Sequence, residues 1–200
     1  MKTGIILARL QPIHNGHLEL IKKAQRENDQ VYIFIGSADK FNKRNPIPIS
    51  TRLELTKTSI AQEFSGINYD NMKDIDDALD AGHIYVVPLD DLDDENNNSH
   101  EWGFYLYSKI VTVTKEPSFT IYYSDGFEII TTWFPGFILR NNVSLSLLAR
   151  NSVENGISAT SVRKMIMEGD DENLKKVVPK CVFNMREHLR TLIELSEKIH

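Results

Sequence analysis

The sequence predicts an α/β protein in which an open parallel sheet is flanked by helices and followed by further C-terminal helices. Short, continuous apolar runs recur along the chain, which is typical of strands buried on both faces of a parallel sheet. Amphipathic helical patterns lie between and after these runs, as the crossovers of parallel strands require. The 200 residues, 41% of them hydrophobic and 26% charged, have the size and composition of one globular domain.

The first elements form one βαβ unit. Thr3 to Ala8 is an apolar run bounded by polar residues and is predicted to be a buried strand. A turn from Pro12 to Gly16 leads into an amphipathic helix, whose apolar positions are Leu18, Ile21 and Ala24. Val31 to Ile35 is the second buried strand. The crossover of such a unit is right-handed in almost every known case.

Later elements continue the alternation. A loop from Gly36 to Ile49 follows the second strand, and a helix is expected from Thr51 onward. Ile84 to Val87 and Phe119 to Tyr123 are two more short apolar runs, each ended by a turn-forming residue, and predict two more strands. Two helices are expected near the end, with apolar positions at Val162, Met165 and Ile166 and at Val182, Met185, Leu189, Leu192, Ile193 and Ile199. The whole pattern indicates a Rossmann-like sheet.

Charge and cysteine content exclude several classes of protein. There are 28 acidic and 23 basic residues, so the formal net charge is −5 and a broad basic surface for nucleic acid or an anionic membrane is not expected. Cys181 is the only cysteine, which excludes an internal disulfide and a thiolate zinc site. The apolar run in MKTGIILARL is too short for a signal sequence or a spanning helix. We therefore expect a cytoplasmic protein.

The residues just after the first strand are candidates for chemistry, because ligands of open parallel sheets bind beyond the carboxyl ends of the strands. His14 lies in the turn and His17 in the first helical turn, near the positive end of the helix dipole, so both can face one anion. Gly16 leaves room for a ligand, and Asn15 is expected to cap the helix. Two surface histidines beside a turn are the alternative. A zinc site is disfavoured, since no nearby Asp, Glu or Cys completes a tetrahedral set, and no metal ligand is predicted.

A second cluster opens the late helix after Gly156. Ser158 or Thr160 is expected to cap that helix, and Thr160 and Arg163, three residues apart, share one of its faces. A hydroxyl, backbone N–H groups and a guanidinium would then surround one anion, which favours a phosphate. The alternative is an ordinary cap and an arginine that extends to solvent.

Two segments resemble motifs of the nucleotidylyltransferase superfamily, H-x-G-H after the first strand and I-S-x-T-x-x-R late in the chain. They are His14-Asn15-Gly16-His17 and Ile157-Ser158-Ala159-Thr160-Ser161-Val162-Arg163. With Arg9-Leu10-Gln11-Pro12, Ile35-Gly36-Ser37-Ala38 and Arg44-Asn45-Pro46, the sequence is similar to the archaeal-type nicotinamide mononucleotide adenylyltransferases. The resemblance implies a catalytic domain at residues 1–170, with residues 171–200 as a C-terminal helical extension of the same domain. It also implies transfer of AMP from ATP to nicotinamide mononucleotide, giving NAD and pyrophosphate, with Mg²⁺ as cofactor.

The resemblance also implies roles for single residues. Catalytic roles fall on His14, His17, Arg44 and Arg163. Contacts with ATP and its phosphates fall on Arg9, Gly16, Ser158, Thr160 and Arg150. Contacts with the acceptor fall on Trp102, which would stack on the nicotinamide ring, and on Asp91 and Asn98 in the acidic, Asn-rich loop before it.

Two features depart from the family and keep alternatives open. Ala8 stands where the family has glycine, and the acidic loop falls where the family recognises the mononucleotide, although such a charge run is usually a solvated loop. Trp102, like Trp133, is equally compatible with a place in the core. One alternative is therefore another phosphorylated acceptor, such as phosphopantetheine or a sugar or alcohol phosphate. Another is a regulatory module that binds nucleotide without turnover. Whether copies of the chain form a homo-oligomer also stays open.

Overall fold

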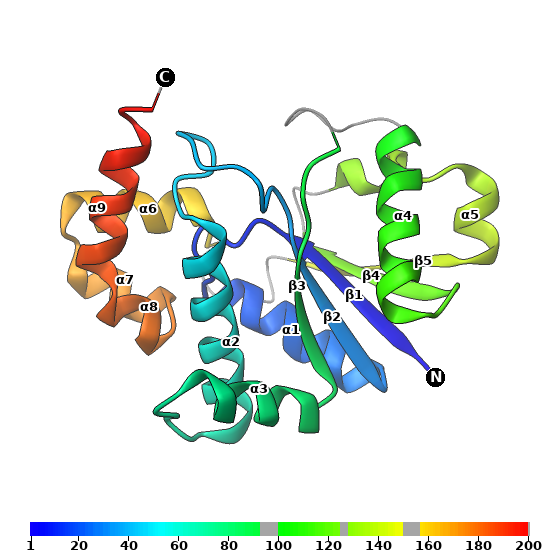
Figure 1. The fold of residues 1–200 in the computed structure, drawn as a ribbon, viewed down its shortest axis with the longest axis horizontal. Coiled ribbons are helices and arrows are strands. Elements are labelled where there is room, and N and C mark those ends of the chain that lie inside the picture. Colours follow the sequence, from blue (N-terminus) through cyan, green and yellow to red (C-terminus); the bar gives the residue numbers. More distant parts are fainter. Residues whose placement is uncertain (93–99, 125–127, 150–156, 200) are drawn as a thin grey trace.

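The computed structural model of this protein describes residues 1–92, 100–124, 128–149 and 157–199 (Figure 1). Within these residues a five-stranded sheet has the strand order β3-β2-β1-β4-β5, and every neighbouring pair is parallel. The strands are β1 (Thr3–Ala8), β2 (Gln30–Ile35), β3 (Ile84–Pro88), β4 (Phe119–Ser124) and β5 (Val143–Leu148). The predicted Rossmann-like α/β class is confirmed, because the chain reverses its direction of strand addition after β3, as in other doubly wound sheets.

Helices connect the strands and follow the last one. They are α1 (Asn15–Glu27), α2 (Ile49–Ser65), α3 (Met72–Ala81), α4 (His100–Thr114), α5 (Gly136–Asn141), α6 (Ala159–Glu168), α7 (Asp171–Val177), α8 (Lys180–Asn184) and α9 (Arg186–Ser196), with a short 3-10 helix at Glu128–Thr132. Among the described helices, none is both long and apolar enough to cross a membrane.

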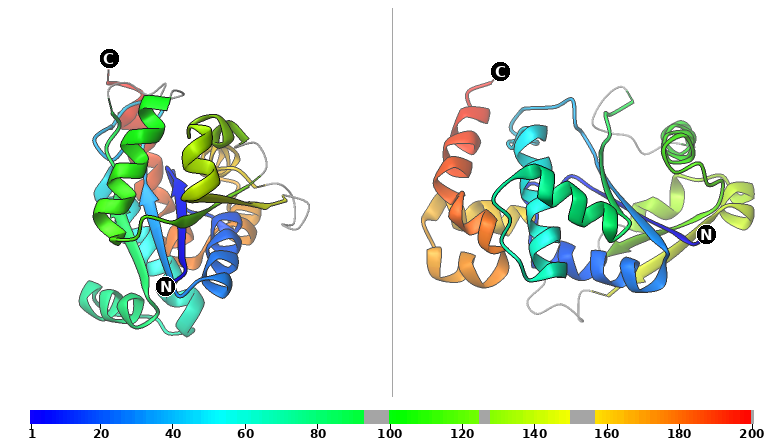
Figure 2. Two further views of the ribbon diagram at one scale, coloured as in Figure 1. Left: turned by 90° about the vertical axis from the view of Figure 1, so that its right-hand side faces the viewer. Right: turned by 60° about the horizontal axis from the view of Figure 1, so that its bottom comes forward.

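The sheet separates two apolar cores. Ile5 and Ile6, each 1% exposed, point to opposite faces of β1 and belong to different cores, as the two-residue period of a strand requires. The first core packs β1–β3 against α1, α2, α3 and the C-terminal helices. The second packs the other face against α4 and α5, which Figure 2 shows on the opposite side of the sheet from α1.

The C-terminal helices are part of the first core. Leu174, Val182 and Leu189 are each 0% exposed and come from α7, α8 and α9. The Arg186 guanidinium also donates to the carboxylate of Asp171 at 2.9 Å, which joins α9 to α7. The predicted boundary at residue 170, between the catalytic domain and its C-terminal extension, therefore lies between packed helices. This assignment of the two parts stays a prediction.

Three local expectations were wrong or incomplete. β5 was missed, because Val-Ser-Leu-Ser-Leu-Leu alternates polar and apolar residues as an edge strand with one wet face does, and lacks a continuous apolar run. The expected long terminal helix is interrupted at Met185, which ends α8 and precedes α9. His14 occupies the N-cap of α1 with an extended backbone, so Asn15 is the first helical residue and not the cap.

Candidate active site

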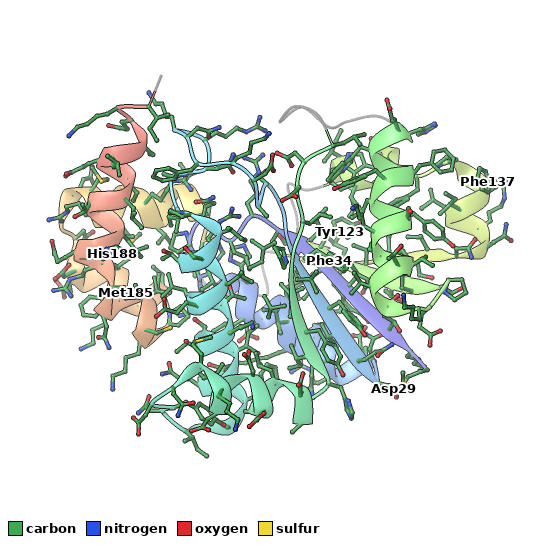
Figure 3. All side chains as sticks on the ribbon, viewed as in Figure 1. Asp29, Phe34, Tyr123, Phe137, Met185 and His188 are labelled. Carbon is green, nitrogen blue, oxygen red and sulfur yellow. The ribbon has the colours of Figure 1, made fainter. Side chains whose placement is uncertain are left out.

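The loops after β1 and β2 lie at the carboxyl edge of the sheet. In Figure 3, Asp29 marks the opposite, amino-terminal edge of β2, and Phe34 lies close to its carboxyl end. Just past this edge two non-glycine residues, Leu10 (φ 50°) and Ser37 (φ 51°), adopt the left-handed conformation. Such residues cost free energy and persist only where the surrounding structure holds them, which is typical of ligand sites.

The two histidines of the early turn are stacked on one another. Their ring centroids are 3.7 Å apart with an interplanar angle of 29°. The backbone N–H of His14 donates to Nδ1 of His17 at 3.3 Å, which fixes the ring of His17 to the start of α1. Gly16 is the second residue of that helix. The predicted pair therefore forms one unit at the positive end of the α1 dipole.

The contact at Nδ1 determines which nitrogen of His17 can donate. Because Nδ1 accepts a hydrogen bond, the proton of the neutral ring must lie on Nε2. Burial of His17, together with the neighbouring His14, lowers its pKa well below 6.5. At neutral pH His17 is thus an uncharged imidazole with a fixed Nε2–H donor.

The late cluster meets the early turn in space. Ser158 caps α6 as predicted, and its hydroxyl accepts from the backbone N–H of Ser161 at 3.1 Å. Arg163, one turn further along, donates from Nη1 to the backbone oxygen of Gln11 at 2.8 Å, across 152 residues of sequence. Its Nη2 donates to Oγ1 of Thr160 at 3.4 Å, so these two residues share a face as predicted. Groups that were predicted to bind phosphate, from both ends of the chain, are thus brought to one place.

Gln11 also fixes the loop that carries Arg44. Its side-chain Oε1 accepts from the backbone N–H of Ile47 at 2.8 Å, and its Nε2 donates to the Ile47 carbonyl at 3.3 Å. Arg44 itself is exposed on a tight turn closed by Asn42, whose Oδ1 accepts from the backbone N–H of Arg44 and of Asn45 at 3.0 and 2.9 Å. The basic loop is therefore attached to the histidine turn, and the guanidinium of Arg44 is open to solvent.

Three arginines from three elements gather at this edge. Arg9 follows β1, Arg52 lies in the first turn of α2, and Arg163 lies in α6. Burial, together with the charge of Arg9, lowers the pKa of Arg163. Burial likewise lowers the pKa of Arg52 to about 10, with Asp91 opposing and Arg9 reinforcing this shift. A cluster of mutually repelling cations beside helix N-termini is suited to hold a polyphosphate, whose charge would relieve the repulsion.

Of the predicted acceptor residues, Asp91 lies at the carboxyl edge of the sheet and Trp102 lies in the second core. Asp91 follows β3, and its Oδ1 accepts from the hydroxyl of Ser37 at 3.2 Å. Burial is the main reason why the pKa of Asp91 is raised. Trp102 is on α4 in the second core, only 4% exposed, and meets Trp133 edge to face at 6.0 Å between centroids. In this arrangement little of its indole is open to a substrate ring, and the stacking role stays a prediction.

Two predicted residues, Asn98 and Arg150, lie outside the described residues. Within the described residues, no group of three His, Cys, Asp or Glu side chains is placed to hold a metal ion. A hollow of about 760 Å³ opens at the amino ends of β1, β4 and β5, and none of the predicted site residues lines it.

Sequence reasoning missed Arg52 and gave Gln11 no role of its own. A signal for Arg52 was present, because it shares a helix face with Leu55, Thr56 and Ser59, all of them buried. A charged residue at an otherwise buried position of a helix indicates a specific partner. Nothing in the pattern indicated the side-chain contacts of Gln11, since they depend on a loop that has no periodicity.

Comparison with known proteins shows the family to which this chain is similar. A family model described as cytidylyltransferase-like matches residues 7–165. The chain is 31% identical over 185 residues to a nicotinamide-nucleotide adenylyltransferase of Picrophilus torridus, which covers 90% of this chain and 86% of that protein. It is 27% identical over 186 residues to the protein of the same name from Methanolobus tindarius, with 92% and 87% covered.

Solved structures share the fold. A bifunctional NMN adenylyltransferase/ADP ribose pyrophosphatase from Francisella tularensis, complexed with AMP and a manganese ion, matches with a TM-score of 0.65 and 18% identity. The match covers 98% of this chain and 51% of that one, so this chain spans about half the length of that relative. A nicotinic acid mononucleotide adenylyltransferase from Plasmodium falciparum matches with a TM-score of 0.59 and 14% identity, over 97% and 98% of the two chains.

Proposed function

Because this chain belongs to the cytidylyltransferase-like family of nucleotidylyltransferases, we propose that it transfers AMP from ATP to nicotinamide mononucleotide, giving NAD and pyrophosphate. The observation that carries the proposal is the contact between Arg163 and the backbone of Gln11 at 2.8 Å. This contact brings the helix start at Ser158 and the histidine turn to the same edge of the sheet, as a site for one triphosphate requires.

The reaction needs no protein nucleophile. A phosphate oxygen of the mononucleotide attacks the α-phosphorus of ATP, a new P–O bond forms, and the bond to the β-phosphate oxygen breaks as pyrophosphate leaves in line. The protein accelerates this step by aligning the two substrates and by stabilising the charge that develops on the α-phosphate and the leaving group.

The described residues can be given roles in that step. The uncharged His17 donates from Nε2 to an oxygen whose charge increases, and His14, stacked on it, belongs to the same donor unit. Arg9 and Arg163, which lie close enough to repel one another, would neutralise the triphosphate together, and the exposed Arg44 would add a further positive charge. Gly16 at the start of α1, and Ser158 and Thr160 at the start of α6, would place helix N-termini near the phosphates.

Mg²⁺ is the proposed cofactor, bound chiefly through the oxygens of ATP. Mg²⁺ prefers oxygen ligands and usually binds one or two carboxylates in addition to phosphate. The Asp91 carboxylate fits this chemistry, since its buried Oδ2 makes no hydrogen bond within the described residues and it follows β3 at the same edge. When bound, the ion would screen the charge of the β- and γ-phosphates.

A second candidate is transfer of AMP to another phosphorylated acceptor. It is favoured by the burial of Trp102, because the side chain expected to stack on the nicotinamide ring is packed into the second core. The groups expected to hold ATP do not depend on which acceptor is used.

The test is an assay of the purified protein with ATP, Mg²⁺ and nicotinamide mononucleotide, in which NAD is measured by an enzymatic cycling reaction. The proposal expects NAD above the level of a His17→Ala control. Pyrophosphate release with phosphopantetheine or an alcohol phosphate, but no NAD, would support the second candidate. Binding of ATP with no pyrophosphate release from any acceptor would instead indicate a nucleotide-binding module without turnover.

A further inference from the structure

Arg52 is a buried cation that holds three backbone carbonyls. Its side chain is 1% exposed, although it lies in the first turn of α2. Nη1 donates to the carbonyl of Arg9 at 2.9 Å and to that of Gly36 at 2.8 Å, and Nη2 donates to that of Ser37 at 2.8 Å. One guanidinium therefore joins the segment after β1 to the segment after β2.

These carbonyls lie where the ladder between β1 and β2 ends. The last backbone contact between the strands is the hydrogen bond from the Gly36 N–H to the Ala8 carbonyl at 3.1 Å. Beyond it, β1 and β2 no longer pair with each other, and the negative ends of their last carbonyls would repel a phosphate. Arg52 donates to three of these carbonyls, of which that of Ser37 also accepts from the Lys40 N–H at 3.2 Å. Arg52 is itself too deeply buried to reach a ligand.

The same contacts hold the two left-handed residues. Arg52 binds the carbonyl just before Leu10 (φ 50°) and that of Ser37 itself (φ 51°). A non-glycine residue in this conformation costs about 1–2 kcal/mol and needs its surroundings to hold it. Release of the guanidinium would let both segments move to ordinary conformations, and the backbone of Arg9 would move with them.

Packing alone does not explain a cation at this position. Within the described residues Arg52 makes no ion pair, and the carboxylates of Asp91 and Asp39 act on it only through space. Burying a charge without a paired carboxylate is unfavourable unless polar groups compensate it, and here three backbone carbonyls do so. The charge of Arg52 therefore acts on the backbone of the two segments that flank Arg9 and Ser37.

We propose that Arg52 is a positioning residue for ATP: it shapes the carboxyl ends of β1 and β2 so that Arg9 faces the triphosphate. The proposal rests on the proposed function only in that ATP is the ligand of this edge. Arg52 does not touch the substrate, and its effect on the nucleotide passes through Arg9 and the backbone around it.

The test compares ATP binding by Arg52→Lys and by the wild type, using calorimetry without any acceptor. Lysine keeps the charge but cannot reach three carbonyls with a planar fork, so we expect the Kd for ATP to rise about tenfold or more. In an Arg9→Ala background the same substitution is expected to raise Kd less than about threefold, because the residue being positioned is absent. Where NAD formation is measurable, KM for ATP should rise and KM for nicotinamide mononucleotide should stay unchanged.

Arg190→Lys is the matched control. The Arg190 guanidinium also binds a backbone carbonyl, that of Ile166, at 3.0 and 2.7 Å, but it joins α9 to the C-terminal end of α6 and not to the segments after β1 and β2. It should lower the melting temperature and leave the Kd for ATP unchanged. If folded Arg52→Lys binds ATP as tightly as the wild type, or if its loss is equally large without Arg9, the inference is overturned.

The test also covers a variant that does not fold and a wild type that forms no NAD. Should Arg52→Lys fail to fold, it is measured in a Ser37→Gly background against Ser37→Gly alone, since glycine adopts positive φ without strain. A wild type that binds ATP but forms no NAD would overturn the proposed function. The inference on Arg52 would then still be decided by the Kd values, because ATP binding is measured without acceptor. A wild type that does not bind ATP would overturn both.

Discussion

His17 is an unusual histidine because its proton is placed by the backbone. The N–H of His14 occupies Nδ1, and burial keeps the ring uncharged, so the donor at Nε2 is present over the whole neutral range. A donor that needs no protonation can stabilise a developing negative charge without a proton transfer. This arrangement leads to two predictions.

The first concerns stability and pH. The folded pKa of His17 lies below 6.5, so at lower pH the unfolded chain binds a proton that the folded chain excludes. The free energy of unfolding should therefore fall as pH falls through 6.5, by up to about 1.4 kcal/mol per pH unit. Thermal unfolding between pH 5 and pH 8 should show a smaller pH dependence in His17→Gln. His188→Gln, a change at an exposed position on α9, should behave as the wild type (Figure 3).

The second concerns turnover. His17→Ala should lower kcat by about 2–4 kcal/mol of transition-state stabilisation, with a modest loss of ATP affinity. His17→Gln, which keeps a side-chain N–H donor, should retain more activity than His17→Ala. Steady-state kinetics of pyrophosphate release would measure both. Equal losses in kcat/KM and in ATP affinity, with kcat unchanged, would contradict the role.

The contacts of the Arg163 guanidinium lead to a prediction about activity. Its planar fork reaches Gln11 and Thr160 at the same time, and a lysine cannot do so. Arg163→Lys should therefore reduce kcat/KM for ATP by about 10-fold or more. Lys164→Arg, at the exposed neighbouring position in α6, is the control. Activity near the wild-type level in Arg163→Lys would argue against a bidentate contact with phosphate.

At the scale of single residues, the sequence located the polar groups at the helix starts better than the buried groups that hold the loops. His14, His17 and Ser158 could be found because helix starts that bind anions need a short list of residue types. Arg52 and Gln11 act on carbonyls and amides that any residue could supply, so no pattern marks their partners. The side chain of Trp102 could have been a ligand contact or core, and only the packing of α4 against the 3-10 segment places it in the core.

At the scale of elements, continuous apolar runs located β1 to β4, because strands buried on both faces contain few polar residues. β5 escaped because it is an edge strand with one neighbouring strand, and Ser144 and Ser146 interrupt its apolar run. The break at Met185 escaped because the apolar positions of α8 and α9 continue one helical pattern through it. Periodicity reports which face is buried and does not report where the helix axis turns.

The packing of α4 gives a prediction at this scale. A Cβ at Gly103 would lie 2.0 Å from the backbone oxygen of Trp133, so the helix touches that chain segment directly. Gly103→Ala should lower the free energy of unfolding by about 3 kcal/mol, since backbone must move to accept it. At Gly82 a Cβ would make only ordinary contacts, the nearest at 3.5 Å, so Gly82→Ala should be close to neutral. Urea denaturation of both variants would compare them, and equal stabilities would contradict this contact.

At the scale of the whole molecule, the C-terminal helices are predicted to be inseparable from the sheet. Removal of residues 171–200 would take Leu174, Val182 and Leu189 out of the first core and expose core side chains of α6 such as Val162 and Ile166. It would also remove the Lys176 carbonyl, which accepts from the side-chain amide of Asn15 at 3.2 Å. The shortened chain should lose cooperative unfolding, and the full chain should melt in one transition by calorimetry. Two separate transitions in the full chain would contradict this prediction.

The link between Gln11 and Arg163 has a consequence for the order in which the protein matures. A nascent chain released by the ribosome as far as β5 already has the histidine turn and the strands of the sheet, but it lacks α6, which would close the proposed triphosphate site. A nucleotide bound at that site would then stabilise a chain that contains α6 far more than a shorter precursor. Cellular ATP would thus favour chains that include α6 over truncated ones.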